Sequence, residues 1–436
     1  MTRPRVLIVG AGFAGLACAK GLKKANVQLL VIDKTNHHLF QPLLYQVATA
    51  ALAPADIARP IREVLCNQPH TLVIMAEVTH IDPKARIVTL HTGETYPYDY
   101  LVLAPGARHA YFGHDEWEKI APGLKTLEDA LRIRERILMS FERAERCENI
   151  LEAQKYLNFV IVGGGPTGVE LAGAIAEVAH QTMLGDFRHI DPKKTKIWLI
   201  EGSPYILPTY TPDLCVKAQR DLEELGVRVI CHKRVTSISE DGVQVENTFI
   251  PAQNIFWAAG NAASPLLKTL GIPLDRAGRA TVDSHLNPPG YPDLFILGDA
   301  ACCTDAEGVC VPGVATAALQ EGRYVAEVIR KNLAPTDRPA FKYVDKGSMA
   351  TIGKYRAIAS IGPLHISGFF AWAAWGFVHI LYLIGFRNRV SVLLSWIGLY
   401  LLGRRGARLI VRPVEEIQPP GPSSAAETAG EPTTTP

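Results

Sequence analysis

Two segments of the chain share the same succession of apolar and glycine-rich positions. The apolar run from Arg5 to Val9 leads straight into a glycine-rich turn, a predicted helix and a second apolar run, Val27 to Ile32. Runs this short and apolar are typical of buried parallel strands, so the pattern predicts a βαβ unit. The same pattern returns at Asn158 to Val162. We therefore predict two α/β domains of the same kind.

Two further helices are predicted from composition. The segment from Ala130 to Gln154 is rich in Arg, Glu and Leu, which favour a helix. Another helix is predicted over Asp213 to Leu225, with Gly226 as the residue that ends it.

The C-terminal part of the chain has a different pattern. Ile366 to Phe386 holds 21 residues without a charged side chain except His379 when it is protonated. As one helix it would be about 31 Å long, which is enough to span a bilayer. The second apolar stretch, Val390 to Leu402, is too short to span, and arginines flank it. A spanning helix, a buried helix and an interfacial hairpin all fit, and the flanking arginines favour the hairpin.

The first glycine turn reads Gly10-Ala-Gly12-Phe-Ala-Gly15 and follows a predicted strand. In such a turn the first glycine permits the tight bend, the second lets a pyrophosphate approach the backbone, and the third lets helix and strand pack closely. Asp33 ends the second strand about 20 residues later, where a carboxylate accepts hydrogen bonds from ribose hydroxyls. We predict a dinucleotide site here.

The second glycine turn, Gly163 to Gly168, also follows a predicted strand. Its acidic residue is Glu201, after the predicted strand Lys196 to Ile200. The spacing from Gly168 is longer than usual, so we expect an insertion around 180–191. A carboxylate at this position suits the free 2′-hydroxyl of NADH and would repel the 2′-phosphate of NADPH. The second turn therefore predicts a site for NADH.

Composition and charge narrow the choice of partners. With 48% hydrophobic and 20% charged residues, the chain is expected to be globular, and its net charge of +2 gives no indication of a nucleic-acid partner. The basic residues are unevenly distributed, because nine Lys or Arg and no acid lie between Lys346 and Pro413. A basic, apolar segment on an otherwise acidic chain points to anionic lipid. The eight cysteines form no C-x-x-C motif and have no zinc-like spacing, so no metal site is predicted and reduced thiols are expected. Because the first predicted strand starts at Arg5 and leads straight into a glycine turn, we expect no signal peptide.

Three further motifs resemble those of the pyridine-nucleotide disulfide-reductase-like flavoproteins. Leu294 to Ala300 is similar to their second FAD motif, in which Asp299 would meet the ribityl or pyrophosphate part of FAD. Two short segments, Tyr100 to Gly106 and Ile255 to Gly260, resemble turns of the same superfamily. The resemblance implies one tightly bound FAD at the first glycine turn and NADH as substrate at the second. The disulfide and sulfide:quinone reductases of this superfamily use paired cysteines, for which Cys302 and Cys303 are poorly spaced.

More specific motifs resemble the type II NADH dehydrogenases, which are single-subunit NADH:quinone oxidoreductases. His38 to Gln46 is similar to their segment near the isoalloxazine, and Gly163 to Glu177 to their nicotinamide-site helix. The resemblance implies that Glu170 lies at the nicotinamide–flavin contact, although an acidic residue in a first helical turn is also favoured by the helix dipole alone. Val311 to Gly322 resembles the quinone-site helix, in which Gln320 is kept and Thr316 replaces the usual first glutamine. Lys346 would lie near the quinone.

We therefore expect hydride to pass from NADH to the flavin, followed by transfer of two electrons to ubiquinone or menaquinone without proton pumping. The expected catalytic residues are Glu170, Gln320 and Lys346. The expected cofactor-binding residues lie on the glycine turns, the acids after them and the motifs above: Gly10, Gly12, Phe13, Ala14, Gly15, Asp33, Lys34, Gln46, Ala104, Gly106, Gly163, Gly165, Pro166, Thr167, Gly168, Glu170, Glu201, Ala259, Gly260, Gly298, Asp299 and Gln320.

The expected fold is α/β, with an NADH-binding Rossmann-like domain (158–281) inserted in an FAD-binding one (1–115 and 292–334). A membrane-anchoring helical region (335–412) and a disordered tail (413–436) would follow. We expect peripheral attachment to the cytoplasmic face of a bacterial inner membrane, and the sequence leaves open whether the chain forms a homodimer. Two alternatives remain: a soluble NADH-dependent reductase for a ferredoxin or rubredoxin, and a membrane-bound flavoprotein with a redox-sensing or assembly role.

Overall fold

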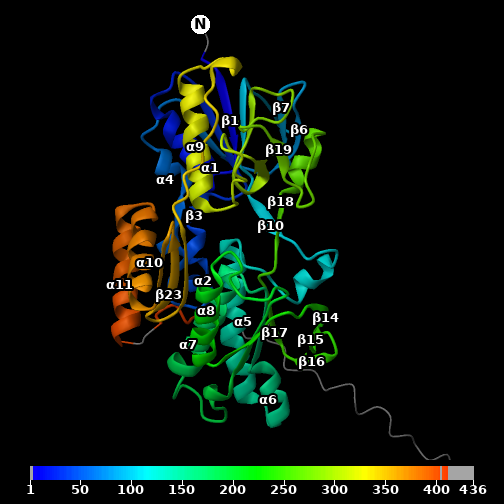
Figure 1. The fold of residues 1–436 in the computed structure, drawn as a ribbon, viewed down its shortest axis with the longest axis vertical. Coiled ribbons are helices and arrows are strands. Elements are labelled where there is room, and N and C mark those ends of the chain that lie inside the picture. Colours follow the sequence, from blue (N-terminus) through cyan, green and yellow to red (C-terminus); the bar gives the residue numbers. More distant parts are fainter. Residues whose placement is uncertain (1–2, 403–404, 411–436) are drawn as a thin grey trace, which may run out of the picture.

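The chain forms two stacked α/β lobes, with a hairpin of two helices along one flank (Figure 1). The computed structural model describes residues 3–402 and 405–410. The tail expected to be disordered lies outside the described residues.

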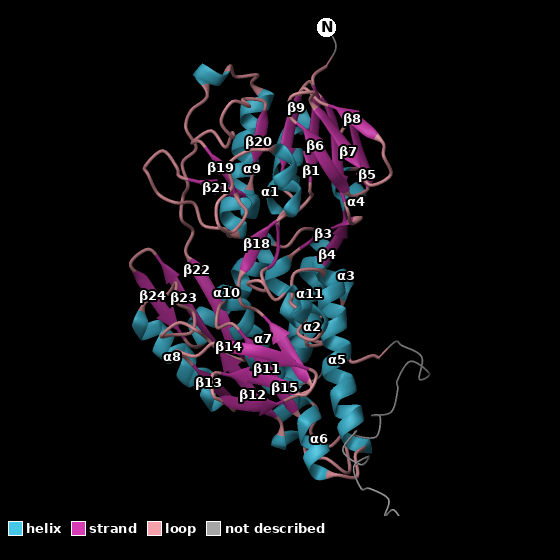
Figure 2. Ribbon diagram, turned by 90° about the vertical axis from the view of Figure 1, so that its right-hand side faces the viewer, coloured by secondary structure: helices cyan, strands magenta, loops and turns pink. Residues whose placement is uncertain are grey.

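The first lobe is built on a five-stranded parallel sheet in the order β20-β9-β1-β2-β5. Both of its faces are covered: helices α1 and α9 lie on one side and the antiparallel sheet β6-β7-β8 on the other (Figure 2). Burial on both faces explains the continuous apolar runs of these strands. The elements are β1 (Arg5–Val9), α1 (Phe13–Gly21), β2 (Gln28–Asp33), β5 (Thr71–Met75), β6 (Val78–Asp82), β7 (Ile87–Leu90), β8 (Thr95–Pro97), β9 (Tyr100–Leu103), β20 (Leu294–Ile296) and α9 (Ala315–Arg330), with the small parallel pair β19 (Ala280–Val282) and β21 (Ala301–Cys303).

The second lobe repeats this plan with a four-stranded parallel sheet in the order β13-β12-β11-β17. Its elements are α5 (Leu127–Arg146), α6 (Ile150–Tyr156), β11 (Asn158–Val162), α7 (Pro166–Glu177), β12 (Lys196–Ile200), α8 (Pro212–Glu224), β13 (Val227–Ile230), β17 (Asn254–Trp257) and the antiparallel sheet β14 (Val235–Ser239), β15 (Gly242–Val245) and β16 (Thr248–Pro251). Two Rossmann-like units in one chain confirm the predicted fold class.

The two lobes are joined by a short antiparallel pair, β10 (Ala107–His109) and β18 (Asn261–Ala263), which lies between them in Figure 1. A connecting segment after β2 also reaches the second lobe, because Phe40, Leu43 and Ile57 belong to the same apolar core as Phe159. This segment contains β3 (His37–Leu39), α2 (Leu44–Ala48), α3 (Pro54–Ile57), β4 (Ala58–Pro60) and α4 (Ile61–Leu65).

One of the two helix predictions needs correction, and the other is confirmed. The helix expected over 130–154 is two helices, because the chain turns at 147–149 and Asn149 caps α6 by accepting from the backbone of Leu151 at 2.8 Å. A strong N-cap residue favours a new helix start over continuation of the old one. The helix expected over 213–225 is α8, and Gly226 follows it with φ +91°. The insertion expected near 180–191 contains a π-helical turn, Val178–Thr182, and a loop.

The C-terminal region begins with a sheet that was not predicted, β22 (Ser348–Gly353), β23 (Arg356–Ile361) and β24 (Leu364–Ser367). Helices α10 (Phe369–Tyr382) and α11 (Phe386–Leu402) follow. The stretch 366–386 is therefore not one helix: β24 takes its first residues, and α10 has 14 residues, about 21 Å in length. Within 3–402 and 405–410, no helix combines the length and the apolar character needed to cross a bilayer. The alternative of a spanning helix is wrong for these residues.

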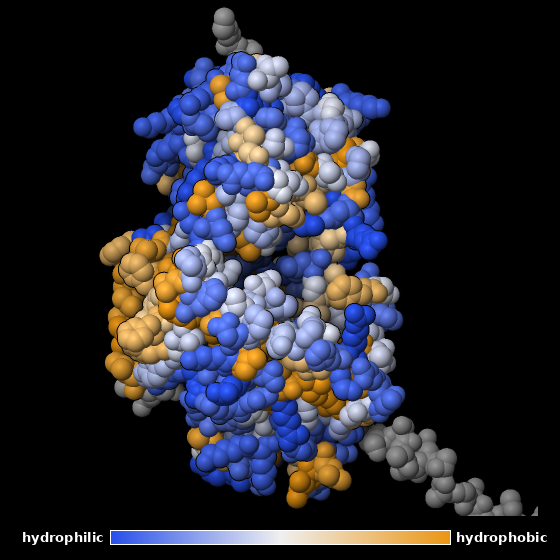
Figure 3. Space-filling model, viewed as in Figure 1, coloured by the Kyte–Doolittle hydropathy of each residue, from blue (hydrophilic) through white to orange (hydrophobic). Residues whose placement is uncertain are grey.

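Apolar side chains gather on the outer flank of the hairpin (Figure 3). We call this surface the hairpin flank; its exposed residues are Phe369, Phe370, Phe377, Leu381, Tyr382, Phe386, Leu393, Leu394, Ile397 and Leu401. The inner side of the hairpin is packed on protein, with Trp375 and Val392 almost fully buried. His379 also faces protein: its ring lies 4.4 Å from that of Trp375, and burial lowers its pKa to about 4. The hairpin thus has apolar side chains on both sides, one packed against protein and the other exposed.

Candidate active site

The first glycine turn has the steric demands of a nucleotide cradle. Gly10 has φ +91°, and a Cβ there would lie 2.2 Å from the carbonyl oxygen of Ala104. A Cβ on Gly15 would lie 1.8 Å from the oxygen of Gly10, whereas one on Gly12 would meet nothing within 4 Å. Gly12 therefore faces open space at the start of α1, whose first turn carries no acidic residue. Free backbone N–H groups and the positive helix end at that point suit a pyrophosphate.

Asp33 organises this cradle through its carboxylate. One oxygen accepts from the backbone N–H of Ala11 at 2.6 Å, and the other accepts from that of Thr35 at 2.7 Å. The Thr35 hydroxyl also donates to the second oxygen, at 2.8 Å. A carboxylate has about four acceptor positions, so about one remains for a ribose hydroxyl. Phe13 begins α1 and packs its ring against His38, Ala14 is buried beneath α9, and Lys34 is exposed beside Asp33.

The second glycine turn repeats the arrangement. Gly163 has φ +110° and leaves no room for a Cβ against the backbone of Ala258, while a Cβ on Gly165 would meet nothing. Glu201 accepts from the backbone N–H of Gly164 at 2.6 Å and from that of Ser203 at 2.7 Å. Pro166 and Thr167 are exposed in the first turn of α7, and Gly168 packs against Gly163. This site has the same design as the first, with glutamate in place of aspartate.

The two predicted turns Ala104–Gly106 and Ala259–Gly260 end β9 and β17. The strands that follow them, β10 and β18, pair with Ala107 opposite Ala263. Both turns therefore lie where the chain crosses between the lobes. Each contains a glycine whose backbone is in the left-handed region of φ. The structure brings the two glycine sites toward one shared region at this crossing.

Asp299 lies after β20, next to the start of the first site. Burial raises its pKa, an effect that Lys125 and Arg279 oppose. The turn is held by Glu321 of α9, which is 2% exposed and accepts from the backbone N–H of Gly298. Burial raises the pKa of Glu321 to about 7. This role of Glu321 was not predicted, because a glutamate within a helix is usually exposed to solvent.

Glu170 lies in α7 beside α2 and β22. Although the residue keeps some exposed surface, its carboxyl lies deep among protein atoms, and this burial raises its pKa to about 8; a hydrogen bond from the backbone of Thr351 opposes the shift. Glu170 lines a cavity of about 20 Å³ together with Tyr45, Gln46 and Glu177, which is room for about one water molecule. A carboxyl with this pKa is protonated at neutral pH and can donate a proton.

Gln46 links this cavity to the hairpin. It is 3% exposed, donates to the hydroxyl of Tyr45 at 2.8 Å and accepts from the indole N–H of Trp396 at 2.7 Å. Binding of the cofactor by Gln46 stays a prediction. Its amide instead connects α2 to α11.

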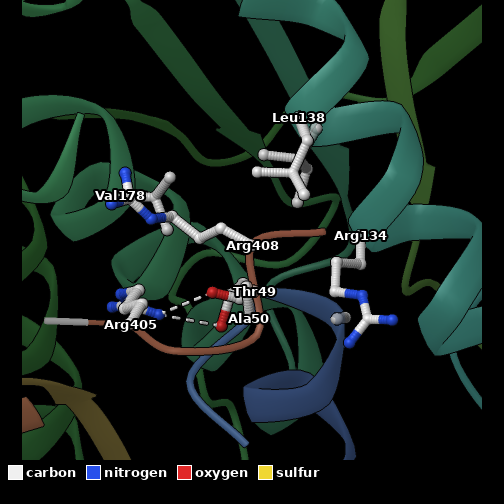
Figure 4. Close-up of a pocket in the computed structure, with 9 residues that line it drawn as sticks. Thr49, Ala50, Arg134, Leu138, Val178, Arg405 and Arg408 are labelled. Carbon is white, nitrogen blue, oxygen red and sulfur yellow. Dashed lines mark hydrogen bonds between the residues drawn. The ribbon is translucent and has the colours of Figure 1, made fainter. Parts of the chain in front are cut away.

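Arg405 also lines this cavity. Figure 4 shows Arg405 beside Thr49 in a second, neighbouring pocket, which Arg134, Val178 and Arg408 also line. The Arg405 guanidinium donates to the carbonyl and hydroxyl of Thr49, at 2.9 and 3.1 Å, and to the carboxylate of Glu177 at 2.9 Å. Arg408 pairs with Asp186, and Arg389 donates to the carbonyl oxygens of Leu381 and Leu383 at the end of α10. Arg405 is therefore buried within protein, whereas Arg408 and Arg389 combine protein partners with partial exposure. Arg404 and Arg412 lie outside the described residues.

The predicted quinone-side residues lie near one another. The Gln320 amide forms two hydrogen bonds of 3.0 Å with the backbone of Val344, and it also donates to the carbonyl of Thr316 at 3.1 Å. Gln320 thus fixes the segment that leads to Lys346. Lys346 is exposed, and within the described part of the chain its ammonium group has no hydrogen-bond or ion-pair partner.

Comparisons with known proteins cover nearly the whole chain. The family model described as pyridine nucleotide-disulphide oxidoreductase matches residues 4–322, and the model of the NDH2 C-terminal domain matches residues 346–405. The chain is 45% identical over 419 residues to the type II NADH:quinone oxidoreductase Ndh of Mycobacterium tuberculosis, over 93% of this chain and 89% of that protein. It is 43% identical to NdhA of the same organism, over 98% and 95%. The structure of NDH2 from Plasmodium falciparum in complex with NADH has the same fold, with a TM-score of 0.86 at 20% identity over 94% of this chain and 100% of that one.

Proposed function

Because the chain belongs to the family of type II NADH:quinone oxidoreductases, we propose how its own residues divide that reaction. The enzyme takes electrons from NADH, holds FAD as its cofactor and reduces a quinone without pumping protons. When bound, FAD supplies the two-electron relay between a hydride donor and a quinone.

The residues at the first glycine turn fit FAD. A cradle in which Gly12 and the open end of α1 face free space suits the pyrophosphate, and Asp33 retains acceptor capacity for the ribose. Asp299 would accept from hydroxyls of the ribityl chain. Lys34, Ala104 and Gly106 would contribute to the rim of this site.

The residues at the second glycine turn suit NADH. Glu201 is held by two backbone N–H groups, so its carboxylate is oriented before NADH arrives. Such preorganisation lowers the entropy lost on binding. Hydride transfer depends mainly on proximity and orientation. The pairing of β10 with β18, which follow the turns of the two lobes, would help to keep the two sites close together. Ala259 and Gly260 would line the nicotinamide end.

On the acceptor side, we assign proton delivery to Glu170 and quinone orientation to Lys346. The buried Glu170 carboxyl carries a proton at neutral pH, and reduction of a quinone to the quinol consumes two protons. Gln320 acts as a positioning residue for Lys346, because its amide is already bonded to Val344. The position of Glu170 at the junction of α7, α2 and β22, beside a cavity with room for about one water molecule, is the observation that carries this assignment.

The hairpin flank would insert into one leaflet, since a quinone is dissolved in the acyl layer and its reductase must reach that layer. Attachment to the cytoplasmic face of an inner membrane follows from where NADH is available. A homodimer of this chain stays a prediction.

The test is to purify the full chain and follow its yellow flavin. We expect NADH to bleach the flavin and ubiquinone and menaquinone analogues to restore it, with both assayed side by side. A colourless protein, or a flavin that NADH does not bleach, would overturn the donor half; a bleached flavin that no quinone reoxidises would overturn only the acceptor half.

A further inference from the structure

A cavity of about 630 Å³ lies where the first lobe meets the turn of the hairpin. Its walls come from α1, α9 and the segment joining α10 to α11. The volume falls in the range of ligand pockets, roughly 300 to 1,000 Å³. It is distinct from the small cavity beside Glu170 and shares none of its lining residues.

The charge of this cavity is one-sided. Lys20 of α1, Arg323 of α9 and Arg389 of α11 line it, and no Asp or Glu does. Arg389 uses two of its N–H groups to bond the end of α10. Lys20 and Arg323 are exposed and form no hydrogen bond or ion pair within the described residues. Three like charges around one cavity favour an anionic occupant.

The rest of the wall is apolar and opens onto the hairpin flank. Leu381 and Tyr382 line the cavity and are 50% and 41% exposed. Phe386, which is 83% exposed, follows directly after the lining segment. The cavity thus lies at the boundary between the hairpin flank and the charged first lobe, which is where the phosphates of a bilayer would be if the flank is inserted.

One buried polar residue, His38, also lines this space. His38 is 3% exposed and donates through Nδ1 to the carbonyl of Ala11 at 2.9 Å. The neutral ring therefore has an acceptor at Nε2, which has no hydrogen-bond partner among the described residues. A small shift of the His38 ring would let this acceptor meet a hydroxyl of a bound molecule.

We propose that this cavity binds one anionic phospholipid of the membrane. Its phosphate is held by Lys20 and Arg323, its acyl chain lies along Leu381 and Tyr382, and a headgroup hydroxyl faces His38. A neutral quinone would leave the three cations without a counter-charge, and a free phosphate would leave the apolar wall exposed. The proposal rests on the membrane attachment proposed above and adds to it a specific lipid site.

The test uses the full-length flavoprotein and vesicles of phosphatidylcholine, with or without phosphatidylglycerol. The double variant Lys20→Gln/Arg323→Gln is compared with Lys84→Gln/Arg276→Gln, which removes the same charge from exposed positions outside the cavity. Because each basic residue at an anionic surface contributes about 1 kcal/mol, we expect the cavity variant to bind phosphatidylglycerol vesicles roughly 10- to 30-fold more weakly. Binding to phosphatidylcholine vesicles, and NADH oxidation with a water-soluble quinone, should stay at the wild-type level.

Several outcomes would overturn the lipid site while leaving the proposed function intact. Equal losses in the cavity and control variants would mean general surface electrostatics. Full competition by inorganic phosphate would identify a soluble anion instead. A raised KM for a lipophilic quinone with unchanged vesicle binding would assign the cavity to quinone. Failure of the wild type to reduce any quinone would count against the proposed function, whatever the vesicles show.

Discussion

Replacement of Arg405 by Met should destabilise the whole C-terminal attachment. The Arg405 side chain is 2% exposed and that of its partner Glu177 is 12% exposed, so the pair is shielded from solvent. Removing one partner of a buried pair typically costs about 3–5 kcal/mol, mostly because the other charge remains buried. Glu177 keeps its hydrogen bond from the backbone N–H of Lys354, which places the expected loss near the lower end, about 3 kcal/mol.

The assay is thermal unfolding of the flavin-loaded protein, followed by circular dichroism and flavin fluorescence. For a chain of this size, a loss of about 3 kcal/mol corresponds to a fall in Tm of about 3–4 °C. Arg408→Met is the matched control, since Arg408 pairs with Asp186 where both side chains are a third or more exposed. Exposed pairs contribute about 0–1 kcal/mol, so that variant should change Tm by about 1 °C or less.

A double-mutant cycle with Glu177→Gln tests the cause. If the buried charge is what matters, the variant that carries both changes should lose clearly less than the sum of the two single losses. Equal shifts for Arg405→Met and Arg408→Met, or strictly additive losses in the cycle, would refute the reasoning.

Three further predictions concern the cofactor and substrate sites. Glu170→Gln should remove the ionisation near pH 8 from the pH profile of quinone reduction. Wild-type activity should fall as pH rises through the raised pKa because the proton is lost, whereas the activity of the variant should be lower and independent of pH in that range. An unchanged profile would count against proton donation by this residue. Glu201→Ser should lower kcat/KM for NADH by about tenfold. It should also reduce the ratio of kcat/KM for NADH to that for NADPH, and steady-state kinetics with both nucleotides measures both effects. Gly10→Ala should give protein largely free of flavin, because the new Cβ would collide with the carbonyl oxygen of Ala104. A purified variant with the full visible absorbance of bound flavin would contradict this steric argument.

The glycine turns and their acids were predictable from the sequence because the demands on them are local. A strand, a turn with φ above zero and a helix start occupy about ten consecutive residues, and the acid follows at the end of the next strand. The hydrogen bonds from Asp33 and Glu201 to the glycine turns agree with that local logic. Their contacts with nucleotides stay predictions.

The features that were missed depend on contacts between distant parts of the chain. Sheet β22–β24 is positioned by α7, where Gly173 is needed because a Cβ would lie 1.8 Å from the carbonyl oxygen of Ile352. No motif near Ile352 in the sequence indicates that Gly173, which lies 179 positions earlier, is its neighbour in space. The burial of Arg405 has the same origin, since its partners Thr49 and Glu177 come from two other regions.

This difference bears on how the arginines of the C-terminal region should be interpreted. In the sequence they form one basic segment, and a basic segment beside apolar stretches indicates a membrane surface. In the structure four of them have protein partners: Arg356 with Glu224, Arg405 in a buried pair, Arg408 with Asp186, and Arg389 at the end of α10. The free cations beside the hairpin turn include Lys20 and Arg323, which lie some 300 positions apart in the sequence and come from the first lobe. If the proposed lipid site exists, its selectivity for anionic lipid depends on how α1 and α9 are placed over the hairpin. The full chain should then bind anionic vesicles more selectively than a variant that lacks the charges of Lys20 and Arg323.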